Sequence, residues 1–344
     1  MTRVRPVSNG QNYAQYVSQE AEAGEWAGRG AERLHLAGEV SAREFAALRC
    51  GKDPKTGETL RRNMEDRVYE KPWGEKVYKA REFYEITVSA PKSVSIQGIV
   101  DPEVVNAHVH AVEKIMQDLE HVAQEELVMA AWQHGTSRAG DPQLHTHIAV
   151  LNVAHDKRGW HALHASVLFQ NQRQFTAEYR AALLGEIERK GYRIKYPEIA
   201  GISDEMRAKY SQRTQQKNEL IEWHEEAHGM QPGGGAIQAM VLSSRPPKDP
   251  RTARQIAAEQ YDRLAPAERA ELVALATESG ERRSPYVAPE IQAKYGGRVV
   301  VQMVEQKGKT PHLVIRDGGS VEGSAEEEPE WSYGKRKRGP GMGT

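Results

Sequence analysis

The sequence is poor in cysteine: Cys50 is the single one among 344 residues. This excludes an intramolecular disulfide framework and a zinc cluster built from thiolates, and it fits a reducing compartment. The chain also lacks a hydrophobic run of membrane-spanning length, and its N-terminus lacks the apolar segment of a secretory signal. We therefore expect a cytoplasmic protein with no membrane partner.

An excess of charge of one sign is missing as well. The 47 Lys and Arg residues nearly balance the 48 Asp and Glu residues, so a nucleic-acid partner would have to bind local basic patches. The nucleotide-binding pattern GxxxxGK[ST] is absent, which excludes an ATP-driven helicase within this sequence. Hydrophobic residues make up 38% and charged residues 28%, which predicts a globular chain long enough for two domains.

Three histidines, His134, His145 and His147, lie within the stretch HGTSRAGDPQLHTHIAV. Short apolar runs flank this stretch and the turn formers SRAGDP lie inside it, which predicts a β-hairpin. A turn between Ala139 and Gly140 places His134 opposite His145, and His147 shares their face. Three imidazoles then converge as the ligands of an open metal site. An HxH pair alone is equally typical of a solvated strand face, but the third histidine in mirror-image register favours the metal.

Residues 82–90 alternate between apolar and polar side chains, which predicts a half-buried strand with Glu85 on the non-core face. Pro91 then begins a helix, and the backbone N–H groups there, beside Lys92, suit a phosphate, although a simple capped helix is an equal alternative. A long amphipathic helix is expected over 101–126.

Towards the N-terminus, a short strand is expected over 3–7 and a helix after it. Tyr13 and Tyr16 share one face of that helix, and the pattern alone favours packing on the core. Residues 28–51 predict a helix, a turn and a second helix. Residues 52–80 are polar and poorly periodic, which predicts a loop or lid.

Beyond the histidines the pattern predicts further helices and two short strand regions. In order, we expect a helix over 171–190, a strand over 192–196, helical structure over 203–230, two or more short helices within 236–279, a small hairpin over 299–317 and a disordered tail from about Gly318.

A second histidine pattern, HEEAH from His224 to His228, fits the HExxH motif of zinc proteases. It lies in an expected helix. Because short patterns of this kind arise by chance in charge-rich helices and the longer protease pattern does not follow, the histidine hairpin is the favoured metal site.

Three ordered blocks of sequence carry a resemblance to a known family, with SQRTQQ at 211–216 as a weaker fourth block. They are EWAGRGAERLHLAGEV at 25–40 with Trp26, Gly28, Gly30 and Leu36, EITVSAPKSVSIQ at 85–97, and HGTSRAGDPQLHTHIAVLN at 134–152. The sequence resembles the MobF group of HUH endonucleases, the relaxase domains of conjugative plasmid relaxase–helicases.

The resemblance implies an α+β fold, a two-layer palm with a central antiparallel sheet backed by helices. It implies a catalytic palm over 1–200 and a helical DNA-clamping region over 201–285. A small β-hairpin and a flexible charged tail would then occupy 286–344.

The implied activity is nicking of one DNA strand at a transfer origin, followed by strand transfer in conjugation. A tyrosine attacks a phosphate and becomes joined to the 5′ end, and both Tyr13 and Tyr16 are candidates. His134, His145 and His147 would hold a divalent ion (Mg, Mn or Zn). Glu85 would orient a metal-bound histidine or help to deprotonate the tyrosine.

The chain departs from the family pattern in three respects. Single tyrosines stand where the family commonly has pairs, Glu85 replaces the usual aspartate, and no helicase follows the relaxase segment. The chain is therefore expected to be either a fragment or a relaxase that uses a helicase in trans.

The implied partners are single-stranded or hairpin DNA, accessory DNA-binding proteins and the coupling ATPase of a type IV secretion system. The protein would act in the bacterial cytoplasm and be exported with DNA to a recipient. Lys92, Arg138 and Arg213 are candidate phosphate contacts, each alternatively a solvated charge. Trp132 is a candidate for base stacking or a core residue.

Two alternatives remain open. A rolling-circle replication initiator shares the metal and the tyrosine chemistry, and its nucleophile would be Tyr179. A regulator that binds a DNA hairpin without nicking would explain the reduced set of tyrosines.

Overall fold

The structure is a computed structural model. It describes residues 2–11, 13–18, 23–62, 66–71, 74–244, 251–282, 299–304 and 312–317. The chain divides into two compact units, Met1–Arg282 and Arg283–Thr344. In the second unit, β11 (Val299–Val304) pairs antiparallel with β12 (His312–Asp317), as the sequence predicts. The tail expected from Gly318 lies outside the described residues.

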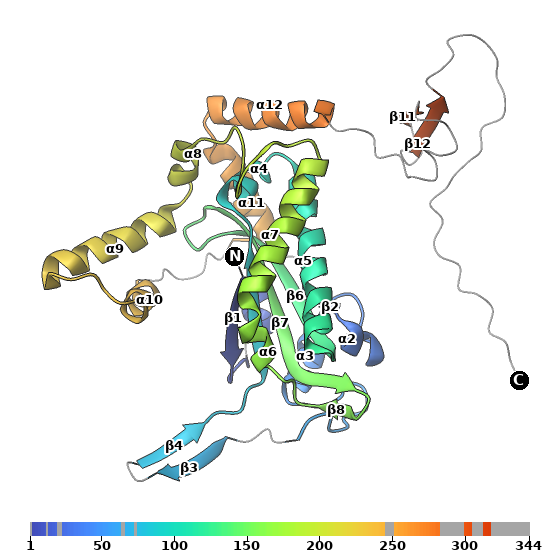
Figure 1. Cartoon of the computed structure of the whole chain (residues 1–344), viewed down its shortest axis with the longest axis vertical. Helices are drawn as coiled ribbons and strands as arrows, with labels where there is room; N and C mark the ends of the chain where they lie inside the picture. Colours follow the sequence, from blue (N-terminus) through green and yellow to red (C-terminus); the bar gives the residue numbers. More distant parts are fainter. Residues whose placement is uncertain are drawn as a thin grey trace, which may run out of the picture. The chain divides into compact units, whose positions relative to one another are not determined.

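A six-stranded antiparallel sheet forms the centre of the first unit (Figure 1). The strand order is β1-β5-β7-β6-β2, with β8 paired to the end of β7. The strands are β1 (Thr2–Val7), β2 (Glu25–Ala27), β5 (Phe83–Ser89), β6 (Glu126–Thr136), β7 (Pro142–Asp156) and β8 (Gly159–His161). The expected central antiparallel sheet is confirmed.

Helices α5 and α7 lie side by side on one face of this sheet (Figure 1). Helix α5 begins where the Asp101 side chain accepts a hydrogen bond from the Glu103 N–H, with Pro102 in the first turn. The apolar side chains between sheet and helices include Ile86, Ile115, Ile148 and Phe175. The helices on this side are α4 (Lys92–Gln97), α5 (Pro102–Ala123), α6 (Ser166–Gln170) and α7 (Gln172–Arg189).

The other face of the sheet is covered too. A second core cluster joins Phe83 and Leu151 of the sheet to Val17 of α1 and Phe45 of α3. The helices involved are α1 (Tyr13–Ser18), α2 (Arg29–Arg33) and α3 (Ala42–Arg49). The strand expected to be half-buried is therefore covered on both faces, and Glu85 is only 4% exposed.

Gly28 and Gly30 allow the chain to pass close to β6. Gly28 has a φ of 92°, and a Cβ atom there would lie 2.4 Å from the carbonyl oxygen of Leu127. A Cβ atom on Gly30 would lie 2.8 Å from the same oxygen. Both positions therefore exclude side chains for steric reasons, and Gly28 also has a backbone conformation that favours glycine.

Two segments differ from the sequence-based expectation. The region 52–80 is not only a loop, because β3 (Arg67–Lys71) and β4 (Gly74–Tyr78) form a hairpin that extends away from the sheet (Figure 1). Its polar composition lacks the core-facing periodicity by which strands are recognised. The strand expected over 192–196 is reduced to β9 (Ile194–Lys195), paired with β10 (Glu198–Ile199).

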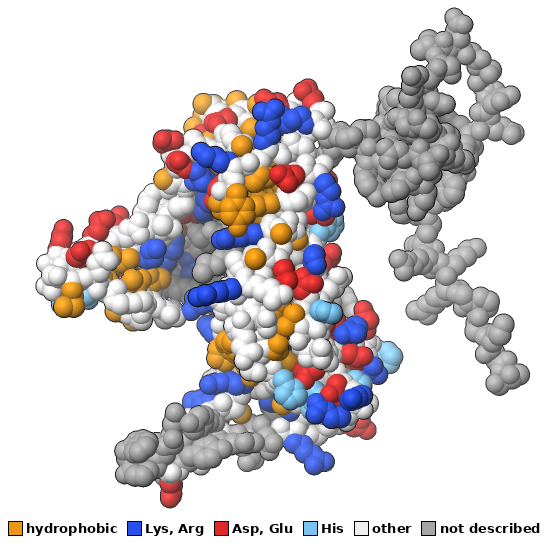
Figure 2. Space-filling view, viewed as in Figure 1, with side chains coloured by type: hydrophobic (Ala, Val, Ile, Leu, Met, Phe, Trp, Pro, Cys, Tyr) orange, Lys and Arg blue, Asp and Glu red, His pale blue; other side chains and the backbone are white. Residues whose placement is uncertain are grey.

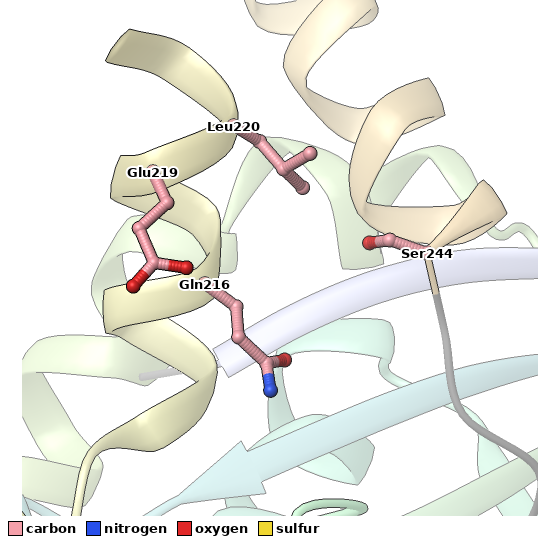
Figure 3. A pocket seen from close by; sticks show the side chains of 4 residues that line it. All are labelled: Gln216, Glu219, Leu220 and Ser244. Atoms are coloured by element: carbon pink, nitrogen blue, oxygen red, sulfur yellow. The ribbon is translucent and has the colours of Figure 1, made fainter. Parts of the chain in front are cut away.

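The C-terminal part of the first unit is helical. Helix α9 carries a pocket of about 340 Å³ lined by Gln216, Glu219, Leu220 and Ser244 (Figure 3), a lining that includes none of the three hairpin histidines. The helices here are α8 (Asp204–Lys209), α9 (Gln212–His228), α10 (Gly234–Ser243), α11 (Ala253–Arg263) and α12 (Pro266–Arg282). Among the described residues, no helix has the length and apolar character needed to cross a membrane.

Candidate metal and nucleophile site

The hairpin β6–β7 brings the three predicted histidines together. His134 pairs with His145 across the hairpin, and His147 follows on the same face of β7, so the predicted register is confirmed. The ring centroids lie 5.0–5.1 Å apart in all three pairs. One ligand nitrogen from each ring lies within 4.8 Å of the other two.

Each imidazole is fixed by a contact outside the cluster. His145 Nδ1 lies 2.7 Å from the Gln143 carbonyl oxygen, and His147 Nδ1 lies 2.9 Å from Glu85 Oε1. Both rings therefore keep Nε2 for a metal ion. His134 has Nε2 2.7 Å from the Val17 carbonyl oxygen, so it would bind a metal through Nδ1 or give up this contact.

The electrostatics favour the form of imidazole that binds metal. Burial, and then the neighbouring charges of His147 and His134, hold the pKa of His145 well below its ordinary value. The neutral ring is the ligand form. Three imidazole nitrogens of this kind fit a divalent ion.

Glu85 connects the metal site to β1 and α1. Its carboxylate contacts His147, forms an ion pair with Arg5 from the neighbouring strand, and accepts a hydrogen bond from Tyr13. Burial alone would raise the pKa of Glu85. The contacts with His147, then Arg5 and Tyr13, outweigh burial and lower the pKa to about 2. Glu85 is therefore an anion at neutral pH.

Tyr13 lies within hydrogen-bonding distance of Glu85. Its hydroxyl group donates to Glu85 Oε1 over 2.8 Å, the same oxygen that His147 contacts. The ring packs against Phe83, with centroids 4.7 Å apart, and is 7% exposed. Tyr16 lies one turn further along α1, and its side chain lies outside the described residues.

Trp132 occupies the core. It is 1% exposed, and its ring packs edge-on against Phe45 and Tyr13 at 5.7 and 5.9 Å. Of its two interpretations, this placement matches the core residue, because neither ring face is open to a base.

The three candidate phosphate contacts are not gathered at one point. Lys92 Nζ donates to the Pro142 carbonyl oxygen over 2.7 Å, and burial lowers the pKa of Lys92. Arg138 lies half-buried in the turn between β6 and β7. Arg213 lies on α9, where it contacts the Val241 carbonyl oxygen. Lys92 and Arg138 thus lie near the histidine hairpin, and Arg213 belongs to the helical region.

Asp141, within the motif that carries the histidines, has a role that the sequence did not reveal. It is 1% exposed and accepts two hydrogen bonds of 2.8 Å from Gln212 at the start of α9. Arg263 of α11 lies 3.3 Å from the same carboxylate and donates to the Gly140 carbonyl oxygen. This contact joins the turn of the histidine hairpin to the C-terminal helices.

Tyr179 is not placed to act as a nucleophile. It lies on α7, behind the sheet, fully buried, and burial raises the pKa of its hydroxyl group strongly. That hydroxyl group lies 2.6 Å from His108 Nδ1. This geometry removes the residue on which the rolling-circle alternative depends.

His224 and His228 stack on one exposed face of α9, with ring centroids 4.3 Å apart. No third His, Cys, Asp or Glu ligand joins them among the residues that the structure describes. The protease interpretation therefore lacks the third ligand of a catalytic zinc site.

A central antiparallel sheet that holds three histidines beside a buried tyrosine is the arrangement expected of a relaxase. The sequence matches the TrwC relaxase family over residues 4–267. This match covers well over half of the chain, so the chain belongs to the TrwC relaxase family. The resemblance to MobF relaxases is confirmed.

Two similar proteins in Escherichia coli are both the multifunctional conjugation protein TraI. The TraI of strain K12 is 34% identical over 192 residues, and the match covers 48% of this chain and 10% of TraI. A second TraI is 33% identical over the same length. The matched segment thus spans about a tenth of these curated relatives.

Solved structures of a conjugative relaxase resemble the fold. Metal-bound TrwC in complex with OriT DNA has a TM-score of 0.66 and 28% identity, covering 80% of this chain and 98% of that one. TrwC with a 27-mer DNA that comprises the recognition hairpin and the cleavage site has a TM-score of 0.63 and 29% identity, with the same coverage. The chain is thus a member of a relaxase family, and its three hairpin histidines are a group that could hold a divalent metal ion.

Proposed function

We propose that the protein nicks one DNA strand at a transfer origin and mediates strand transfer in conjugation. The observation that carries the proposal is the shared Glu85 oxygen, which lies 2.8 Å from the Tyr13 hydroxyl group and 2.9 Å from His147 Nδ1. In this proposal the nucleophile would stand beside a metal ligand. The TrwC structures with OriT DNA support DNA of a transfer origin as the substrate.

The proposed reaction is a transesterification with Tyr13 as nucleophile. The phenol oxygen bonds to the phosphorus atom, the bond from phosphorus to the 3′ oxygen breaks, and the proton ends on that 3′ oxygen. The products are a 5′-phosphotyrosyl bond and a free 3′ hydroxyl group, which makes the step reversible. Glu85, an anion at neutral pH, would orient the phenol by accepting its hydrogen bond.

His134, His145 and His147 would hold the divalent ion, and Glu85 fixes the ring of His147 so that Nε2 faces it. A bound ion of Mg, Mn or Zn would neutralise one phosphate oxygen and orient the scissile bond. Tyr16 is the second candidate nucleophile, one helical turn from Tyr13.

We propose single-stranded or hairpin DNA as the partner. The palm of 1–200 would carry the chemistry, and the helices of 201–285 would close over the strand. Residues 286–344 would be an appendage. Arg138 and Arg213, and Lys92 if it releases the Pro142 carbonyl oxygen, would contact phosphates.

Further partners complete the proposal. They are accessory DNA-binding proteins, a type IV secretion coupling ATPase and a helicase in trans. The protein would act in the bacterial cytoplasm and leave with the DNA strand.

The test is incubation of the full chain with single-stranded oligonucleotides from the transfer origin of its own genetic element, with Mg²⁺ or Mn²⁺. A protein–DNA adduct that survives denaturing electrophoresis is expected. It should be lost after chelation and in a variant carrying His145→Ala and His147→Ala, while a scrambled oligonucleotide gives none. Hairpin binding without an adduct under every metal condition would instead identify a regulator.

A further inference from the structure

A second cluster of histidine and carboxylate side chains lies at the far end of β7. Glu125 precedes β6, Asp156 ends β7, His161 ends β8, and His164 follows in the next loop. At the 3.3 Å rise of a strand residue, this end lies about 30 Å from His147. Figure 2 shows histidine and acidic side chains gathered at this end, around β8. This second cluster is therefore separate from the three histidines of the hairpin.

The distances suit a metal ion. One ligand atom from each of Glu125, His161 and His164 lies within 4.8 Å of the other two. His164 Nδ1 contacts Glu125 Oε1, and His161 Nε2 lies 3.8 Å from that oxygen and 3.3 Å from Asp156 Oδ2. Ligands of a tetrahedral zinc ion with bonds of about 2.1 Å stand about 3.4 Å apart. Small side-chain movements would therefore complete the coordination.

The hydrogen bonding of His161 supports a metal ion independently of these distances. Both of its ring nitrogens are buried, and within the described part of the chain neither has a hydrogen-bond partner of acceptable geometry. Buried polar atoms almost always have such a partner, and an absent ion is one physical reason for an exception. Glu125 is only 5% exposed, and a buried carboxylate is normally paired or bound to a metal.

We propose that Glu125, Asp156, His161 and His164 form a second divalent-metal site, suited to Zn²⁺, with a structural role. Imidazole nitrogens and carboxylate oxygens are ligands that zinc accepts. Four protein ligands would leave no open position, in contrast to the three histidines of the hairpin. The ion would join the start of β6 to the β7–β8 hairpin.

The competing explanation is an ion-pair network in which protonated histidines neutralise Glu125 and Asp156. The two explanations predict different numbers of bound zinc ions per chain. We would use the full chain without a histidine tag, carrying His224→Ala and His228→Ala to remove the exposed helical pair, strip it of metal and dialyse it against Zn²⁺. Two bound zinc ions per chain are expected.

His164→Ala is the informative variant, because the His164 side chain is 65% exposed and its loss leaves the core intact. We expect one ion in His164→Ala, one in the His145→Ala, His147→Ala double variant, and none when all three changes are combined. His121→Ala, an exposed histidine on α5, is the matched control and should keep both ions. One ion in the starting protein that remains bound in His164→Ala, or two ions in His164→Ala, would overturn the proposal.

Thermal melting gives a second readout that does not depend on activity. In the His145→Ala, His147→Ala variant, added Zn²⁺ should raise Tm by several degrees, because ligands that bind the folded state stabilise it. Addition of His164→Ala or of Glu125→Gln should remove that shift. A shift that persists in both would contradict the site, as would the absence of any shift in the first variant.

Discussion

Glu85, on β5, contacts groups from two other strands and a helix. Its two oxygens contact His147, Arg5 and Tyr13, and the carboxylate is buried. A buried anion with three partners is rigid, and its removal leaves those partners unpaired. The residue therefore affects both the orientation of the metal ligand and that of the phenol.

Replacement Glu85→Gln keeps the shape but removes the charge. We expect the rate of adduct formation to fall by about 10- to 100-fold, with a similar loss in Mn²⁺ affinity, as is typical for a group that orients a metal ligand. Single-turnover assays and metal titration would measure both. Glu82→Gln, which removes the partner of Arg49 at the strand start, is the control. An unchanged rate in Glu85→Gln would show that the carboxylate is not used.

His108 makes stability depend on pH. It is fully buried between Tyr179 and Thr146, and burial, then the charge of the N-terminus, lowers its pKa to about 3. An unfolded histidine has a pKa of about 6.5. Between these values the unfolded chain binds more protons, so stability falls as pH drops from about 6.5 towards 3.

The size of this effect can be isolated with His108→Gln. Between pH 6.5 and 5 the wild type should lose about 2 kcal/mol more stability than the variant. Urea unfolding of both proteins at the two pH values would measure the difference. Parallel pH dependences would mean that His108 is not held neutral in the folded protein.

At the scale of elements, the turn of the histidine hairpin is fixed by helices that come much later in the chain. Asp141 accepts hydrogen bonds from Gln212 and pairs with Arg263, so α9 begins and α11 ends at the same turn. The helical region is thereby coupled to the strand that carries His145 and His147.

Asp141→Ala should lower the free energy of unfolding by about 3 kcal/mol, because it leaves buried donors unpaired. Asp118→Ala, which removes only a surface pair with Lys114, should cost less than about 1 kcal/mol. Chemical denaturation compares the two. Equal small losses would show that the contact does not hold the turn.

The histidine hairpin was predictable because its register follows from local spacing and turn residues. The strand that carries Glu85 was predictable from its alternating apolar and polar side chains. The burial of its polar face was not predictable, because Tyr13, Val17 and Phe45 cover that face. Arg5 and Asp141 escaped notice for the same reason. Their partners lie far away in sequence, and a single sequence does not reveal such contacts.

At the scale of the whole molecule, the family match of 4–267 falls within the compact unit Met1–Arg282. The site residues and the Asp141 contact all lie in that unit. The domain boundaries proposed at 200 and 285 can be examined by truncation.

A chain ending at Arg282 should fold and form the adduct at a rate within about 2-fold of the full chain. Its Tm should differ by only a few degrees, since no site residue is lost. Calorimetry and the adduct assay would measure both. A truncated chain that folds but fails to react would place part of the active site in 283–344.

The most direct test of the account is identification of the residue that carries the DNA. The adduct would be digested and its peptides fragmented by mass spectrometry, with Tyr13→Phe and Tyr16→Phe proteins in parallel. We predict the nucleotide on Tyr13, loss of the adduct in Tyr13→Phe and its retention in Tyr16→Phe. A nucleotide on Tyr16 or Tyr179, or an adduct that survives loss of both early tyrosines, would contradict the account.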